Sequence, residues 1–189
     1  MIALILAGGS GTRFWPMSTN KLPKQFLKLF NNKSMLQLTF ERLEAIFCFE
    51  KIFIVTIKEQ IPLIKEHIPN INDDNIIIEP FGMNTAPCIS LSISYLKRKF
   101  DNNETVFVLP ADHYIPNEQE FSSEIKQGIK YAENDVLLTY GITPTYPATG
   151  YGYIESGDDF QNGLFRVKHF KEKPDFCLAS EFISKGNYF

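Results

Sequence analysis

Three glycines and an arginine near the start of the sequence form a pattern that suits phosphate binding. Gly8, Gly9 and Gly11 follow an apolar run, and Arg13 comes two residues later. Glycine lets the backbone turn sharply and bring bare amide N–H groups against a ligand, and consecutive amides can form a nest for an anion. The Arg13 guanidinium adds fixed charge for a polyphosphate. The segment predicts a phosphate-binding loop, and an ordinary turn after a strand is the simpler alternative.

Neither of two familiar phosphate loops matches this segment. The dinucleotide-binding fingerprint requires a third glycine where Phe14 stands. The P-loop requires Gly-Lys-Ser or Gly-Lys-Thr where this chain has Gly-Thr-Arg. A phosphate loop at this position is therefore of another type.

Four polar residues further along the chain carry groups that could take part in related chemistry. Lys24 has an ammonium group, and Asn84 and Thr85 have side chains that donate and accept hydrogen bonds. Asp112 directly follows an apolar run, and Mg²⁺ prefers one or two carboxylates together with phosphate oxygens. Each residue also has an ordinary explanation: a surface lysine, a helix cap, or a turn former.

Short apolar runs separated by helical patterns predict the elements that position these residues. Right-handed crossovers place helices on both faces of such a sheet, so the expected class is α/β, with three α/β/α layers, a Rossmann-like topology and a mostly parallel central sheet. Open sheets of this kind bind ligands beyond the carboxyl ends of their strands. The predicted strands are 2–6, 51–56, 75–79, 105–109 and 136–140, and the predicted helices are 34–46, 58–67, 85–100 and 118–132.

The pattern changes after Tyr140. Residues 149–155 and 163–170 predict two strands joined by a polar turn at 156–162, which would form a small antiparallel insertion. A last helix is expected to start near Pro174 and Asp175. The chain then stops without a polar tail, so we expect it to be a shortened form of a longer protein. No linker divides it, and residues 1–189 are interpreted as one domain.

Composition excludes several classes of function. The formal net charge is -3 and the basic residues are scattered, so no nucleic-acid partner is expected. The apolar N-terminal run lacks a basic leader and is far shorter than the ~20 residues that span a bilayer. We therefore expect no membrane association and a cytoplasmic location.

Cys48, Cys88 and Cys177 are interpreted as reduced thiols in the core.

Five segments together resemble the sugar nucleotidyltransferases, in the form carried by mannose-1-phosphate guanylyltransferases. The first is LAGGSGTRFWP (6–16), followed by PKQFL (23–27), and it resembles the opening signature of that family. The others follow in the family's order and cover nearly the whole chain. They are EPFGMNTAPCIS (79–90), LPADHYI (109–115), PTYPATGYGYI (144–154) and FKEKPD (170–175).

The resemblance implies a GT-A-like nucleotidyltransferase domain that converts GTP and mannose 1-phosphate into GDP-mannose and pyrophosphate, with Mg²⁺ as cofactor, for polysaccharide biosynthesis. It implies catalytic roles for Arg13, Lys24 and Asp112, with Asp112 also the metal ligand, and a supporting role for His113. The implied nucleotide-binding residues are Leu6, Ala7, Gly8, Gly9, Gly11, Thr12, Arg13, Glu79, Asn84, Thr85, Ala86, Pro110 and Asp112. The implied sugar-phosphate-binding residues are Gly150, Tyr151, Gly152, Glu172 and Lys173.

The sequence departs from the family pattern at two places. Met83 stands where the family usually has Arg or Lys, and the final GNYF resembles only the start of the family's GxYxWNxG segment, whose Asn contacts the sugar. A second metal-binding aspartate is also expected further downstream. Some relatives carry a C-terminal cupin domain with isomerase activity, but without a His-rich cluster we expect no such activity here.

Three other functions stay open at this point. The first is a sugar-1-phosphate nucleotidyltransferase that uses another base or sugar. The second is a regulatory module that binds a nucleotide without catalysis, and the third is a scaffold without a ligand. The oligomeric state also stays open, with a homodimer as one option.

Overall fold

The computed structural model describes residues 1–9, 14–82, 84–132, 136–161 and 163–189. The chain forms two compact units, Met1–Val136 and Leu137–Phe189, called here the first and the second unit. The candidate phosphate loop, Lys24, Asn84 and Asp112 all belong to the first unit. None of the helices in the described ranges is long and apolar enough to cross a membrane.

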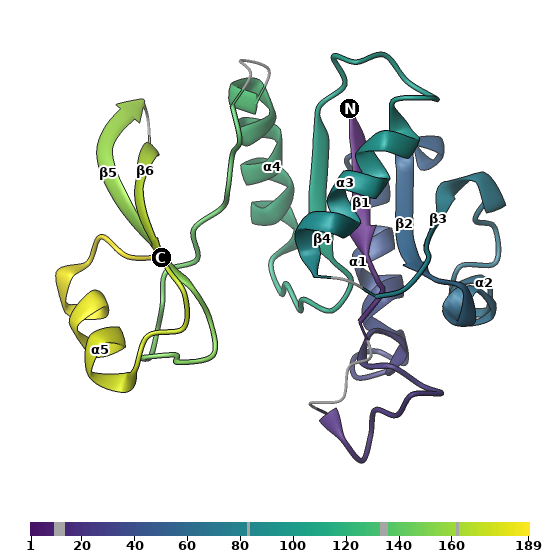
Figure 1. Cartoon of the computed structure of the whole chain (residues 1–189), viewed down its shortest axis with the longest axis horizontal. Coiled ribbons are helices and arrows are strands. Elements are labelled where there is room, and N and C mark those ends of the chain that lie inside the picture. The colour runs from purple at the N-terminus through teal and green to yellow at the C-terminus, as the bar shows by residue number, and fades with distance from the viewer. Residues whose placement is uncertain (10–13, 83, 133–135, 162) are drawn as a thin grey trace. The chain divides into compact units, whose positions relative to one another are not determined.

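A four-stranded sheet forms the centre of the first unit, and every neighbouring pair of its strands is parallel (Figure 1). In spatial order the strands are β3 (Ile76–Glu79), β2 (Ile52–Ile57), β1 (Ile2–Leu6) and β4 (Val106–Pro110). This confirms four of the predicted strands and the α/β class. Pairing continues past β4, since the Ala111 N–H donates to the Leu6 carbonyl at 3.0 Å. The loops after β1 and β4 therefore start side by side at the carboxyl edge of the sheet.

Helices follow the strands as the periodic patterns predict. The first of them begins with a capping box, in which the Ser34 hydroxyl accepts from Gln37 N–H and the Gln37 side chain accepts from Ser34 N–H. The helices of the first unit are α1 (Met35–Glu44), α2 (Ile61–His67), α3 (Thr85–Leu96) and α4 (Glu118–Ala132). Short 3₁₀ turns are η2 (Lys24–Phe26), η3 (Phe49–Lys51), η4 (Lys58–Gln60) and η5 (Asp73–Asn75).

A hydrophobic cluster covers each face of the sheet. Side chains of β1 alternate, so that Ile5 packs in a hydrophobic cluster with α1, α2 and α4, whereas Leu4 packs in a second cluster with α3. Figure 1 shows α3 lying across the sheet on its near side. Continuous apolar strands are typical of a sheet that helices cover on both faces, and this accounts for the three α/β/α layers.

The predicted strand at 136–140 is wrong. These residues form no strand, and Leu137 is fully exposed to solvent. A short apolar run becomes a strand only where a neighbouring strand pairs with it and a packed layer covers it. In the structure this run lies at the boundary between the two units instead.

The second prediction to correct concerns the cysteines. All three thiols are free, as expected, but only Cys88 is buried, while Cys48 and Cys177 are exposed. Phe47 and Phe49, on either side of Cys48, pack on the core around α1 and occupy the inward positions. Apolar neighbours in the sequence therefore did not make Cys48 a buried residue.

The second unit consists of an antiparallel hairpin and one helix, as predicted (Figure 1). Its elements are β5 (Tyr153–Gln161), β6 (Leu164–Lys171) and α5 (Phe176–Lys185). β5 extends through most of the segment predicted as a turn, and Gly163 adopts a φ of 84° just before β6. Asp175 caps α5 by accepting from Leu178 N–H at 2.8 Å. A small core forms around Tyr153, Phe182 and Tyr188.

Candidate functional site

The loops that follow β1 and β3 lie against each other at the carboxyl edge of the sheet. A Cβ atom built on Gly8 would lie 2.1 Å from Oε1 of Glu79, the last residue of β3, and this glutamate is buried. A Cβ atom built on Gly82 would lie 4.0 Å from the Gly8 carbonyl oxygen. Gly8 thus permits a close approach between two segments that the sequence assigned to one nucleotide site.

This close approach gives a first prediction. Gly8→Ala should destabilise the protein by about 1 to 3 kcal/mol, because the new methyl group forces a buried carboxylate out of its position. The free energy of unfolding, measured by urea denaturation, tests this. Gly9→Ala is the matched control, since among the described residues its Cβ would meet no atom within 4 Å. Equal stability of the two variants would contradict the tight Gly8–Glu79 contact.

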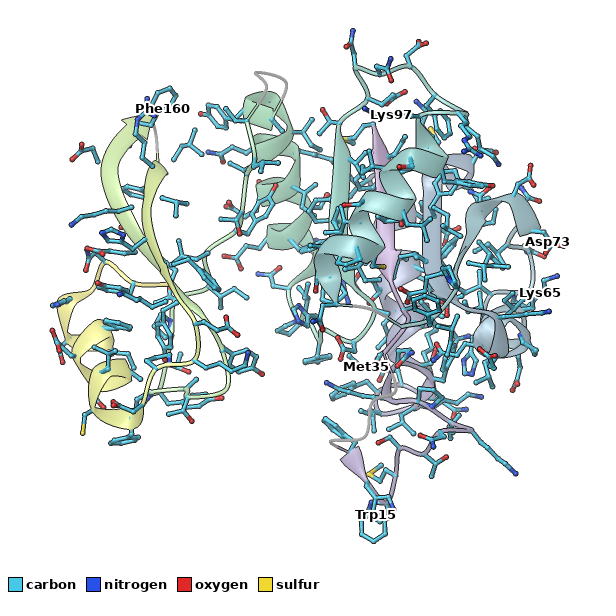
Figure 2. The ribbon with its side chains drawn as sticks, in the orientation of Figure 1. Trp15, Met35, Lys65, Asp73, Lys97 and Phe160 are labelled. Atoms are coloured by element: carbon cyan, nitrogen blue, oxygen red, sulfur yellow. The ribbon has the colours of Figure 1, made fainter. Side chains whose placement is uncertain are left out.

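Lys24 and Asp112 meet at the same edge. Lys24 Nζ lies 3.2 Å from Asp112 Oδ2, and both side chains are partly exposed. The Lys24 ammonium also lies 4.6 Å from the centre of the Phe14 ring. The next residue, Trp15, is 78% exposed, and its side chain projects away from the ribbon (Figure 2). The structure therefore brings two of the three predicted catalytic residues into contact, where an anionic ligand and a cation could reach both.

Local packing explains why the pair forms. Lys24 opens the turn η2, which Phe26 anchors by inserting its ring into the core, where it is 1% exposed. Asp112 follows the buried Ala111, whose N–H bonds to Leu6 and whose carbonyl accepts from Thr39 Oγ1 at 3.4 Å. Each charged residue thus lies next to a buried one, and the backbone on both sides is held.

Asn84, Thr85 and Ala86 are exposed at the start of α3, beyond the Glu79 loop. Asn84 is the N-cap residue by position, but its side chain makes no capping hydrogen bond within the described part of this helix. The explanation of Asn84 as a side-chain cap is therefore not supported. Its amide stays at the surface, next to a helix N-terminus that favours negative charge.

Burial shifts the titration of two residues at this edge. Burial lowers the pKa of His113 from its ordinary value, with Lys24 and Arg42 acting in the same direction and Asp112 opposing them. The imidazole is therefore neutral at neutral pH. Burial, together with the charge of Glu79, raises the pKa of the Cys88 thiol to about 11. Cys88 is thus a protonated thiol and not a nucleophile.

Two groups of predicted site residues remain. Gly11, Thr12 and Arg13 lie outside the described residues. In the second unit, a Cβ on Gly152 would lie 3.1 Å from Glu172 Oε2, and Lys173 forms an ion pair with Glu172. The glycine segment and the Glu-Lys pair predicted to bind a sugar phosphate are therefore neighbours on the hairpin.

Sequence analysis missed three buried polar residues at the glycine loop. Gln25, Gln60 and Thr56 are each at most 4% exposed; the two glutamine amides donate to main-chain carbonyls of the loop, and the Thr56 hydroxyl lies 3.5 Å from the Ala7 carbonyl oxygen. Gln25 lies inside the PKQFL segment, directly after the candidate Lys24. This position in the motif was the signal that could have identified Gln25. Nothing local in the sequence pointed to Gln60.

The described residues contain no group of three or more His, Cys, Asp or Glu side chains that could hold a metal ion alone. The donor set at Asp112 is a single carboxylate, partly exposed and next to the predicted phosphate loop. Mg²⁺ commonly binds through one or two carboxylates and completes its shell with water and substrate phosphates. Asp112 fits this type of site.

Comparisons with known proteins identify the family of this chain. The sequence pattern of the family described as nucleotidyl transferase matches residues 2–189. A mannose-1-phosphate guanylyltransferase of Escherichia coli is 41% identical over 196 residues, which cover 100% of this chain and 42% of that protein. The chain thus spans less than half the length of this relative.

Two solved structures resemble the chain over 99% of its length, each at 34% sequence identity. A protein described as a mannose-1-phosphate geranyltransferase, from Thermus thermophilus, has a TM-score of 0.88, with 54% of its chain covered. A protein described as a mannose-6-phosphate isomerase, from Helicobacter pylori, has a TM-score of 0.77, with 66% covered.

Proposed function

The chain belongs to the nucleotidyl transferase family, and from that premise we propose that it is the nucleotide-binding part of a mannose-1-phosphate guanylyltransferase. The proposed reaction joins GTP and mannose 1-phosphate to give GDP-mannose and pyrophosphate. The observation that carries the proposal is the contact between Lys24 and Asp112 at 3.2 Å, at the edge of the sheet where Gly8 meets Glu79. The name of the Escherichia coli relative supports the choice of substrates.

The reaction is a displacement at the α-phosphorus of GTP. An oxygen of mannose 1-phosphate attacks in line, a new P–O bond forms, and the bond to the β-phosphate oxygen breaks as pyrophosphate leaves. No covalent enzyme intermediate is required. Catalysis of this kind depends on positioning and on the stabilisation of phosphate charge. Lys24 and Arg13 supply that charge, while Asn84 and Thr85 hold the base.

Asp112 holds Mg²⁺ in this proposal. When bound, the ion offsets the negative charge that repels an incoming phosphate monoester. Asp112 is suited to the role because its carboxylate is exposed enough to accept a ligand and its backbone is fixed by the bonds of Ala111. In the complex, a ligand phosphate takes the place of the Asp112 carboxylate as a partner of the Lys24 ammonium.

The sugar phosphate is assigned to the second unit. Gly150 allows a ligand to approach the backbone, since among the described residues a Cβ there would meet no atom within 4 Å, whereas Gly152 packs against the Phe170 ring; Tyr151 is exposed between them. Glu172 can accept hydrogen bonds from sugar hydroxyls, and Lys173 can neutralise the phosphate. Glu172 and Lys173 are both more than half exposed, so their ion pair is easily exchanged for a ligand. The proposed location of the protein is the cytoplasm.

A panel of nucleotides tests the proposal. Thermal unfolding is measured with GTP, dTTP, UTP and CTP in the presence of Mg²⁺, because a ligand at about 100 times its Kd stabilises the folded state by about 2.7 kcal/mol. GTP should give the largest rise in Tm. Pyrophosphate release is then followed with mannose 1-phosphate and with glucose 1-phosphate.

The outcomes separate the rival functions. A preference for dTTP or UTP, or for glucose 1-phosphate, would assign the chain to another sugar nucleotidyltransferase. Saturable GTP binding without pyrophosphate release by the complete protein would indicate a regulatory module. A protein whose Tm responds to none of the four nucleotides would be neither.

A further inference from the structure

A buried amide network encloses the first part of the glycine loop. Gln25 Nε2 lies 2.7 Å from the Ala7 carbonyl oxygen and 3.1 Å from that of Gly9. It also lies 3.0 Å from Gln60 Oε1. Carbonyl oxygens only accept hydrogen bonds, so the NH₂ side of the Gln25 amide must face the loop.

Gln60 and Thr56 complete the network from the other side of the loop. Gln60 Nε2 lies 3.4 Å from the Gly9 carbonyl oxygen. The Thr56 hydroxyl donates to Gln60 Oε1 at 3.1 Å and lies 3.5 Å from the Ala7 carbonyl oxygen. Side chains from three elements, η2, β2 and η4, therefore contact the carbonyl groups of Ala7 and Gly9.

Burying these side chains has a cost that an apolar residue would avoid. Gln25 and Gln60 are 4% exposed and Thr56 is 0% exposed. A buried amide costs about 1 to 3 kcal/mol unless its hydrogen bonds are made. The network makes them with the loop carbonyls, which lie past the end of β1. Its partners are thus specifically the backbone groups of the candidate phosphate loop.

The direction of these carbonyls decides where the amide hydrogens of the loop point. In a trans peptide unit the C=O of one residue and the N–H of the next point to opposite sides. Because Gln25 holds the Ala7 carbonyl inward, the Gly8 N–H points away from the network. An anion nest is built from N–H groups that are fixed in one direction in this way.

We propose that Gln25 and Gln60 are positioning residues, which hold the carbonyls of Ala7 and Gly9 inward so that the N–H of Gly8 faces a triphosphate. This inference rests on the proposed function for the identity of the ligand as a nucleoside triphosphate. Thr56 supports the pair by fixing the orientation of Gln60. None of the three residues needs to touch the substrate.

Variants that keep size but remove donors test this role. Gln25→Met and Gln60→Met should each lower kcat/KM for GTP by about 10- to 100-fold, because a small displacement of the loop has effects of this size. KM for mannose 1-phosphate should change by less than about twofold, because the displaced loop is assigned to the triphosphate and not to the sugar phosphate. The double variant should resemble the single ones, since residues of one network are not additive.

Two controls accompany these variants. Gln127→Met makes the same chemical change at an exposed position of α4 and should leave kcat/KM for GTP unchanged. Thr56→Ser keeps the hydroxyl and should stay near the wild type, whereas Thr56→Val should behave like the Met variants. All assays are run below the Tm of the least stable variant, so that only folded protein is compared.

Calorimetric binding of inorganic triphosphate separates this inference from the proposed enzyme activity. Triphosphate binding that is at least about tenfold weaker in both Met variants supports the inference, by the same displacement argument, even if the protein releases no pyrophosphate. Equal binding in folded variants and wild type would reduce the network to a purely structural role and overturn it. A wild type that does not bind triphosphate would overturn it too, while GTP turnover decides the enzyme function separately.

Discussion

Replacing Lys24 with alanine is expected to lower kcat/KM for GTP by about 30- to 1,000-fold, or about 2 to 4 kcal/mol of transition-state stabilisation. The ammonium lies 3.2 Å from Asp112 and is partly shielded from water, where a fixed charge acts strongly on a developing phosphate charge. Its ion pair is partly exposed, so the Tm should change little. A continuous assay of pyrophosphate release measures the loss.

Lys33→Ala is the matched control for this prediction. Lys33 also belongs to the first unit and also pairs with a carboxylate, since its Nζ lies 2.7 Å from Glu41 Oε2. That pair is exposed and remote from the glycine loop in the sequence, so its removal should leave turnover unchanged. Wild-type turnover by Lys24→Ala would remove Lys24 from the catalytic group. An equal loss in both variants would show that general charge, not position, is responsible.

The fold of the first unit could be predicted because its signals are local. β1 and β2 are apolar runs that are buried on both faces, while β3 and β4 are apolar runs that are partly buried, and such runs indicate parallel strands without reference to distant residues. The run at 136–140 carries the same local signal but is not part of a strand in the described structure. Strand pairing depends on the tertiary structure. The predicted strand at 136–140 was therefore wrong, whereas the predictions of β1 to β4 were confirmed.

The candidate site could be predicted only in outline. That Asp112 would lie near the glycine loop follows from topology, because the carboxyl ends of β1 and β4 share one edge. The contact of Lys24 with Asp112 was not specified by spacing, since the turn η2 depends on how Phe26 inserts into the core. The Gln25–Gln60 bond joins residues 35 positions apart, and no sequence period encodes it.

Asp112→Asn is expected to lower kcat/KM for GTP by about 100-fold or more at low Mg²⁺, because the amide keeps the shape of the side chain but removes its charge. The loss should shrink as the Mg²⁺ concentration rises, since a weakened metal site is filled again by mass action. The Tm should change little, because the carboxylate is partly exposed. Titrating Mg²⁺ against pyrophosphate release measures both the loss and its recovery.

The dependence on Mg²⁺ separates two roles that Asp112 could have. If the carboxylate only orients Lys24 through their 3.2 Å contact, Asp112→Asn should lose activity equally at every Mg²⁺ concentration. If it holds the ion, the apparent affinity for Mg²⁺ must fall. Asp101→Asn is the control, an exposed carboxylate near the opposite end of β4, and it should change neither quantity. An Asp112→Asn variant with unchanged turnover and unchanged Mg²⁺ dependence would place the metal on another group.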